Sequence, residues 1–193
     1  TGKAGILNDF LDFMAGRGNP GTVLGAPSGA SRPPAPEYLA IFDAGMILQP
    51  AVLGARVEQM QRSPRLASAQ FLEDYTNIAG SRVVRADALH EAVFRRVIGE
   101  GHSKRAVMMC RGANALFRRA ALESVGGFDD GRLTAAFAIS SKFARRGWVS
   151  VFVNRTGVAC KGPEGLGSCF TRQFHRALGT AGVLCASLRQ LFR

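Results

Sequence analysis

The stretch EYLAIFDAG, residues 37–45, places an acid directly after an apolar run. Turn-forming residues precede the run, so residues 38–42 are predicted to form a buried β-strand that ends in an acidic turn at Asp43. Ligands of open α/β sheets bind at such carboxyl ends, which makes Asp43 a candidate site residue. The alternative is that Asp43 only caps the following turn or the helix beyond it.

The composition fits one domain with a buried core, because the chain has 193 residues and is 47% hydrophobic. Its formal net charge of +11 calls for an anionic partner: nucleic acid, a phosphorylated small molecule or an acidic membrane surface. The four cysteines form no CxxC pair and no His lies at zinc-ligand spacing, which favours reduced thiols in a cytosolic protein. We find no secretory signal, and the uncharged stretch 177–188 is too short to span a bilayer.

Hydrophobic periodicity predicts helices and strands in alternation along the chain. Helices are expected over residues 4–15, 50–62, 86–98, 120–125, 134–144 and 168–191, and strands over 38–42, 66–71, 107–110, 115–117 and 148–153. The charged residues of the 86–98 helix are expected on a solvated face. Residues 18–36 hold five of the eight prolines and are expected to form a flexible loop.

This alternation predicts an α/β layered domain with a mainly parallel sheet and flanking helices. Its core strands are expected at 38–42, 66–70, 107–110 and 149–153, with Asp43 at the carboxyl edge near the turn at 112–114. Residues 167–193 are expected to form an amphipathic helical tail. Its apolar side is expected to pack against the domain or a lipid surface, and carries Phe170, Leu178, Leu184 and Leu188. Its arginines, Arg172 and Arg176 among them, are expected to face anionic groups.

A series of short motifs follows in order along nearly the whole chain. They are KAGILN (3–8), the strand ending in DAG (38–45), CRGANALFRR with a following AL and GGF (110–128), TAA (134–136), RRGW (145–148) and QFHRA (173–177). Their order and spacing resemble the KAGNLN, D-x-D, CGGTNALFRR-x-AL…GGF, TED, RRGW and Q-x-x-R-W motifs of glycosyltransferase family 2, in its processive, cellulose-synthase-like branch. The resemblance implies a GT-A nucleotide-sugar-binding fold, present here as a single partial domain over 1–193 without the family's opening strands.

The resemblance also implies a reaction, the transfer of a sugar from a uridine diphosphate sugar to a growing glycan acceptor. A diphosphate leaving group needs a divalent cation, Mg²⁺ or Mn²⁺, held by carboxylates and helped by basic side chains. On this basis Asp43 is assigned to metal and donor binding, and Lys3 to donor binding. Gln173 and Arg176 are assigned to the acceptor side, on a helix that lies against the membrane in full-length relatives.

The departures from the family pattern fall at the positions that carry the chemistry. Gly45 stands in place of the second Asp of D-x-D, and Ala177 in place of the acceptor-platform Trp. Ala135 and Ala136 replace both acids of TED, so the position of the general base is occupied by Ala136. We therefore expect a retained fold with a degenerate, catalytically inactive site in which cation binding is weakened or absent.

Other polar residues have simpler interpretations. Asp129 and Asp130 are expected to be turn residues after the GGF motif, and Glu164 a loop or cap acid, although each is an alternative base. The three histidines are expected on the surface, without catalytic or metal partners; they are His90, His102 and His175.

Two rival functions use the basic surface without sugar transfer. One is a non-catalytic nucleotide or polyanion-binding module. The other is a nucleic-acid binder, which is disfavoured because the arginines are scattered over predicted helices without interleaved aromatic residues. A cytoplasmic location is expected, at the inner face of a membrane in the full-length protein.

Overall fold

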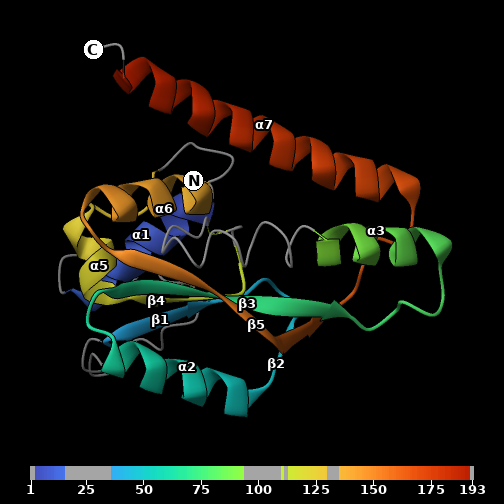
Figure 1. The fold of residues 1–193 in the computed structure, drawn as a ribbon, viewed down its shortest axis with the longest axis horizontal. Helices are drawn as coiled ribbons and strands as arrows, with labels where there is room; N and C mark the ends of the chain where they lie inside the picture. Colours follow the sequence, from blue (N-terminus) through green and yellow to red (C-terminus); the bar gives the residue numbers. More distant parts are fainter. Residues whose placement is uncertain (1–2, 16–35, 94–109, 111–112, 130–134, 192–193) are drawn as a thin grey trace.

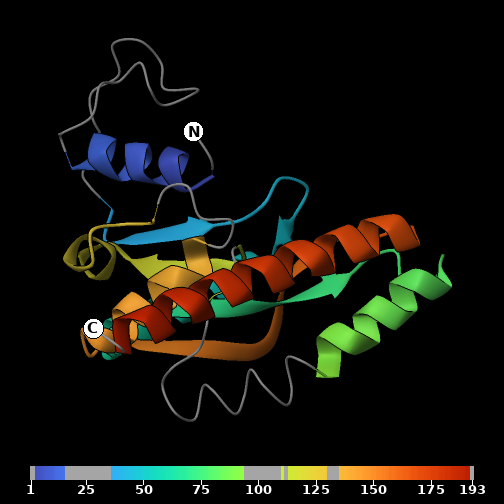
Figure 2. The same cartoon turned by 90° about the horizontal axis from the view of Figure 1, so that it is seen from above.

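The computed structural model describes residues 3–15, 36–93, 110, 113–129 and 135–191. In these residues a five-stranded sheet is flanked by helices on both faces (Figures 1 and 2). The helices are α1 (Lys3–Met14), α2 (Pro50–Arg62), α3 (Arg82–Val93), α5 (Arg119–Ser124), α6 (Ala135–Arg145) and α7 (Leu166–Leu191). The strands are β1 (Tyr38–Ile41), β2 (Ile47–Leu48), β3 (Leu66–Tyr75), β4 (Ala115–Arg118) and β5 (Val149–Cys160).

The sheet is mixed, with the strand order β1-β4-β3-β5-β2. Only β3 and β5 pair in parallel; β4 is antiparallel to β1 and β3, and β2 is antiparallel to β5. The α/β architecture is as predicted, but the expectation of a mainly parallel sheet is corrected, because β4 and β2 run against their neighbours. β1, β3 and β5 nevertheless share one direction, so their carboxyl ends point to the same end of the sheet, where β3 and β5 extend beyond β1 to Tyr75 and Cys160.

The strands differ in detail from the predicted set. β4, at 115–118, lies between β1 and β3 in the sheet, whereas we expected 107–110 and not 115–117 among the core strands. Cys110 is buried but belongs to no strand, and 107–109 lie outside the described residues. β3 and β5 continue beyond their apolar runs to Tyr75 and Cys160, because they remain paired through register shifts after Phe71.

Two hydrophobic clusters hold the layers together. One packs the sheet against α1, α5 and α6, and the other packs it against α2 on the opposite face (Figure 1). β4 shows the period of two that a strand between two layers requires. Its Ala115 and Phe117 enter the first cluster, whereas Leu116 enters the second.

The helices lie close to their predicted positions. α2 has the predicted bounds, with Pro50 in its first turn, and its N-cap is Gln49 rather than Asp43. The interpretation of Asp43 as a cap of that helix is therefore wrong. α3 begins four residues before the predicted start at 86, and 94–98 of its predicted range lie outside the described residues. So do 18–35 of the predicted loop.

α7 crosses above α6 and reaches α3 (Figures 1 and 2). No helix in the described part of the chain is both long enough and apolar enough to cross a membrane. All four cysteines are free thiols.

Candidate functional site

Asp43 and Asn114 lie at the same end of the β1–β4 pair. Ile41, the last residue of β1, pairs with Ala115, the first residue of β4. Asp43 and Asn114 follow and precede these two residues, so both belong to the sheet end to which the carboxyl ends of β1, β3 and β5 point. Asp43 is exposed in a turn that is closed by a 3.3 Å hydrogen bond from the Met46 amide to its carbonyl oxygen.

Asn114 is held in a left-handed conformation, with a φ of 59° that is rare for a residue with a side chain. Strand β3 fixes it there. The amide of Phe71 and the side chain of Gln70 both donate to the Asn114 carbonyl, at 2.7 and 3.0 Å. The side-chain Nδ2 of Asn114 donates to Oε2 of Glu73 at 2.6 Å. These contacts hold Asn114 at this sheet end.

Helix α1 carries Lys3 at its first position and is fastened to the turn after α5 through Asn8. The Asn8 side chain donates to the carbonyl of Phe128 at 2.7 Å and accepts from its amide at 2.9 Å. Gly127 has a φ of +72°, and a Cβ there would lie 2.6 Å from Oδ1 of Asn8. The two hydrogen bonds between Asn8 and Phe128, here called the clamp, therefore require glycine at position 127.

The expected TED position lies at the start of α6, where Ala135 is the first helical residue and Ala136 the second. Asp129, an alternative base, forms an ion pair with Lys142 of α6. Asp130 lies outside the described residues, and Glu164 is exposed before α7.

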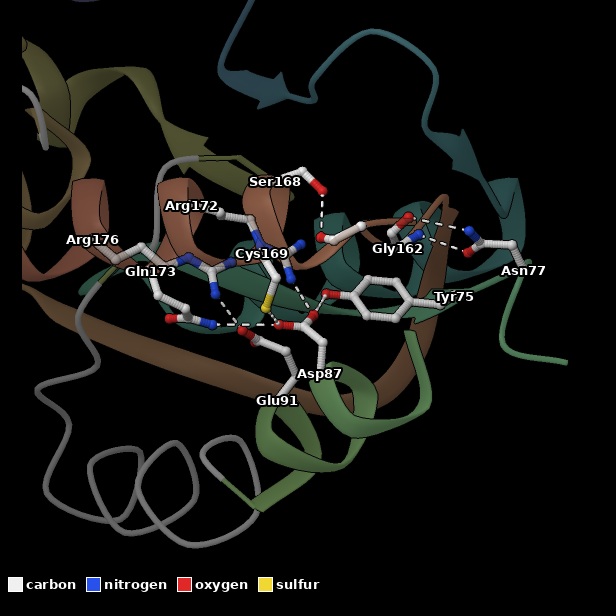
Figure 3. A network of polar contacts seen from close by, with 11 residues as sticks. Tyr75, Asn77, Asp87, Glu91, Gly162, Ser168, Cys169, Arg172, Gln173 and Arg176 are labelled. Atoms are coloured by element: carbon white, nitrogen blue, oxygen red, sulfur yellow. Dashed lines mark hydrogen bonds and ion pairs between the residues drawn. The ribbon is translucent and has the colours of Figure 1, made fainter. Parts of the chain in front are cut away.

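Gln173 and Arg176 contact α3, while both remain partly exposed to solvent (Figure 3). Arg176 pairs with Glu91, and Gln173 donates to Oδ1 of Asp87 at 3.4 Å. Arg172 pairs with Oδ2 of Asp87, which also accepts a 2.7 Å hydrogen bond from Tyr75. Arg172 and Arg176 therefore face anionic groups as expected, but these groups are carboxylates of the same chain.

The network sets the protonation of its members. Burial alone would raise the pKa of Asp87, but the hydrogen bonds from Arg172 and Tyr75 outweigh it and leave the pKa below its ordinary value. Burial and the hydrogen bond to Asp87 raise the pKa of Tyr75. The same two causes raise the pKa of Cys169, whose Sγ lies 3.5 Å from Oδ1 of Asp87, so this thiol is not activated as a nucleophile.

Sequence reasoning missed Asp87 and Glu91. We expected a solvated charged face on this helix, but the two residues are only 4% and 0% exposed, while Leu89 and Val93 are 67% and 55% exposed. The available signal was the spacing: the two acids lie four residues apart, as do Arg172 and Arg176. Side chains at that spacing share one helix face, so two such pairs can meet across a contact.

The residues present fit a divalent cation only in part. In the part of the chain that the structure describes, the group of three potential ligands within reach of one ion is Asp87, His90 and Glu91, which does not include Asp43. Both acids of that group already pair with arginines, and His90 is exposed. Asp43 offers one carboxylate, which suits a cation that takes its other ligands from phosphate oxygens and water.

Comparison with known proteins identifies the family. The model of the family described as glycosyl transferase family group 2 matches residues 38–192. The chain therefore belongs to this family.

Two plant proteins are similar over most of the chain. The first, Probable glucomannan 4-beta-mannosyltransferase 7 of Oryza sativa subsp. japonica, is 25% identical over 148 residues, which cover 76% of this chain and 25% of that protein. The second, Probable glucomannan 4-beta-mannosyltransferase 11 of Arabidopsis thaliana, is 26% identical over 158 residues, which cover 81% and 35%. The chain thus spans between a quarter and about a third of the length of these relatives.

A solved structure confirms the fold. The mannosyltransferase PcManGT from Pyrobaculum calidifontis, in complex with GDP-Man and Mn²⁺, matches with a TM-score of 0.64 and 19% identity, over 98% of this chain and 44% of that one. The GT-A-like fold expected from the motifs is thereby confirmed.

Proposed function

We propose that this chain is part of a sugar-transfer domain of polysaccharide synthesis that keeps its scaffold but does not catalyse transfer by itself. The observation that carries the proposal is the residue set at the acidic positions, Gly45, Ala135 and Ala136. A sugar hydroxyl is a poor nucleophile at neutral pH and needs a carboxylate base beside it. Alanine at both acidic positions of TED supplies no such carboxylate.

The donor is proposed to bind at the sheet end that holds Asp43. Carboxyl ends of strands in α/β sheets are the usual place for nucleotides, and β1, β3 and β5 all point there. Asp43 would hold a cation that bridges to the diphosphate, and Lys3 would neutralise phosphate charge. Because the relatives are named mannosyltransferases and the structural neighbour binds GDP-Man, guanosine diphosphate mannose is as suitable a donor to test as a uridine diphosphate sugar.

The acceptor is proposed to be a glycan that contacts Gln173 and Arg176. Both side chains are partly exposed on α7, and they supply the amide and guanidinium groups that bind sugar hydroxyls. They lie beside α3, which follows β3 at the same sheet end as Asp43.

α7 is proposed to lie against a membrane surface on the cytoplasmic side. Leu166, Phe170, Phe174 and Leu178 recur every four residues, so they form one stripe, and they are 62%, 70%, 61% and 45% exposed. The alternative that Phe170 and Leu178 pack against the domain is wrong at this exposure. The side chains of Leu184 and Leu188, which we also placed on this side, lie outside the described residues.

A second candidate is a nucleotide or polyanion-binding module, which the net charge of +11 favours. Calorimetric titration with GDP-mannose and UDP-glucose in Mn²⁺, combined with a transfer assay on manno-oligosaccharides, separates the candidates. Binding of one donor, weakened in Asp43→Asn, without product supports our proposal. Product formation by the unmodified chain contradicts it. Binding of inorganic polyphosphate as tight as that of any sugar nucleotide favours the second candidate.

A further inference from the structure

Two carboxylates of α3, those of Asp87 and Glu91, are buried beneath the arginines of α7 with which they pair. The side chain of Asp87 is 1% exposed and its partner Arg172 is 29% exposed. The side chain of Glu91 is 0% exposed and its partner Arg176 is 30% exposed. A ligand that approaches this face therefore meets the guanidinium groups, and the carboxylates can act on it only through them.

Asp87 also sets the orientation of an amide. Gln173 directs Nε2 towards Oδ1 of Asp87, so its oxygen points away from that carboxylate (Figure 3). Tyr75 in turn holds Asp87, since its hydroxyl donates to Oδ2 and its ring lies 5.7 Å from Cζ of Arg172. The position of each polar group on this face of α7 thus depends on a residue of β3 or α3.

The charges of this face are compensated. Each of the two guanidinium groups already has a carboxylate partner, so the pairs contribute no net charge. Compensated groups attract a phosphate less than bare arginines do, but they still offer directed hydrogen bonds. Such a face suits a neutral ligand that is rich in hydroxyl groups.

We propose that Asp87 and Glu91 are positioning residues, which fix Gln173 and Arg176 for hydrogen bonds to the hydroxyls of a neutral glycan. The inference rests on the proposed function in one respect, the assignment of Gln173 and Arg176 to the acceptor. Replacing either acid removes the carboxylate that orients its arginine and lets the side chain rotate. Breaking a buried ion pair lowers the stability of the fold, whereas losing the orientation of the side chain lowers the affinity for the glycan.

The first test needs no ligand. In the side-chain NMR spectrum of the 193-residue chain, a guanidinium held by a carboxylate shows separate signals for its two terminal nitrogens, because rotation is slow. We expect separate signals from Arg172 and Arg176. Glu91→Gln should average those of Arg176 and leave those of Arg172 unchanged, and Asp87→Asn should do the converse. Averaged signals in the unmodified chain would overturn the positioning role.

The second test measures the affinity for two ligands in Glu91→Gln and in a control variant that also loses a buried contact of α3. Val84→Ala is the control, because Val84 is fully buried on α3 but belongs to neither ion pair. Glu91→Gln should weaken binding of a manno-oligosaccharide by about tenfold or more, the usual effect of losing a hydrogen bond to a charged group. Its affinity for GDP-mannose with Mn²⁺ should stay unchanged. An equal loss of glycan affinity in Val84→Ala would overturn the inference.

The two hypotheses fail in different ways. If the unmodified chain binds no glycan while both arginines give separate signals, the acceptor assignment is wrong, and with it the proposed ligand of this face. If the glycan binds but Glu91→Gln and Asp87→Asn bind it equally well, the acceptor assignment stands and the positioning role is wrong.

Discussion

Asn8 and Phe128 are 120 residues apart in sequence, yet the side-chain amide of Asn8 makes two hydrogen bonds with the backbone of Phe128. The contact joins α1, which begins at Lys3, to the turn between α5 and α6. It therefore sets the helix proposed to carry the phosphate-binding lysine against the segment that leads to Ala135 and Ala136. Both halves of the contact belong to motifs of the family resemblance, KAGILN and GGF.

Asn8→Ala is expected to destabilise the chain by about 1–3 kcal/mol, because it leaves the amide and carbonyl of Phe128 without these partners. Asn8→Asp keeps the acceptor and loses the donor, so we expect a smaller effect. The free energy of unfolding from urea titrations measures both. Ile6→Ala on the same helix is the control, since Ile6 is 59% exposed. Equal stability of Asn8→Ala and Ile6→Ala would show that the clamp does not stabilise the fold.

Arg118 provides a second test of the scaffold. This residue is 9% exposed, and its guanidinium donates to the carbonyls of Leu66, Met60 and Ser63 at 3.1, 2.5 and 3.3 Å. Lysine lacks the planar fork that reaches several acceptors, so Arg118→Lys should cost about 2–4 kcal/mol of unfolding free energy.

Arg62→Lys is the matched control for Arg118→Lys. Its side chain is 81% exposed and pairs with Glu58 across one helical turn. We expect a change within about 0.5 kcal/mol. An equal loss of unfolding free energy in Arg118→Lys and Arg62→Lys would show that the buried contacts of Arg118 do not stabilise the fold.

The loss of folding stability at acid pH should depend on Asp87. Because its folded pKa lies below the ordinary value of 3.8, the carboxylate stabilises the fold above about pH 4 and this contribution is lost as the pH falls through the folded pKa. Asp87→Asn should therefore be less stable than the unmodified chain at pH 7 and should lose less stability between pH 5 and pH 3. Urea midpoints at each pH measure this difference. Parallel curves would contradict the assignment, and Glu58→Gln, which removes an exposed carboxylate, serves as the control.

Much of the fold could be predicted from the sequence because its signals are local. The apolar run before Asp43, the 3.6-residue period of α2 and the double glycine after α5 each depend on near neighbours. The mixed sheet could not be predicted in this way. Which strand pairs with β4 depends on contacts between distant segments, such as Phe117 with Leu39 and Ser68.

The same limit applies to the candidate site. Motif positions give Asp43, Gln173 and Arg176 from the family pattern alone. Asp87 and Glu91 match no motif, and their charge predicts exposure unless the partner helix is known. Their burial follows from the arginines of α7, which lie about 85 residues further along the chain.

The apolar stripe of α7 should bind lipid. Replacing Phe170 and Phe174 together by serine removes both aromatic side chains of the stripe. Burial of one such side chain is worth about 1.5–3 kcal/mol, so vesicle affinity should fall by at least tenfold. Co-sedimentation with vesicles containing phosphatidylserine measures it. Leu89→Ser, at a 67% exposed position of α3, is the control, and equal binding by the double variant would contradict the membrane proposal.

Restoring the missing acids is the sharpest test of the inactive site. Ala135→Glu and Ala136→Asp place acids in the first turn of α6, which has none, and should stabilise that helix by about 0.3–1 kcal/mol through its dipole. Gly45→Asp is less favourable. A Cβ at Gly45 meets no atom within 4 Å, but the φ of +83° strains any side chain by about 1–2 kcal/mol.

We therefore expect the restored pair at 135 and 136 to fold as well as the unmodified chain, and the further change Gly45→Asp to lower its stability slightly. A missing general base commonly costs a factor of about 10²–10⁴ in rate. The quadruple variant, which adds Ala177→Trp to these three changes, should therefore transfer mannose or glucose faster than the unmodified chain by up to that factor. Radiolabelled product from GDP-mannose or UDP-glucose with Mn²⁺ measures the rate, and Asp43→Asn in the restored background should abolish the gain. Turnover by the unmodified chain at the restored rate would refute the inactive interpretation and direct attention to Asp129 and Glu164 as bases.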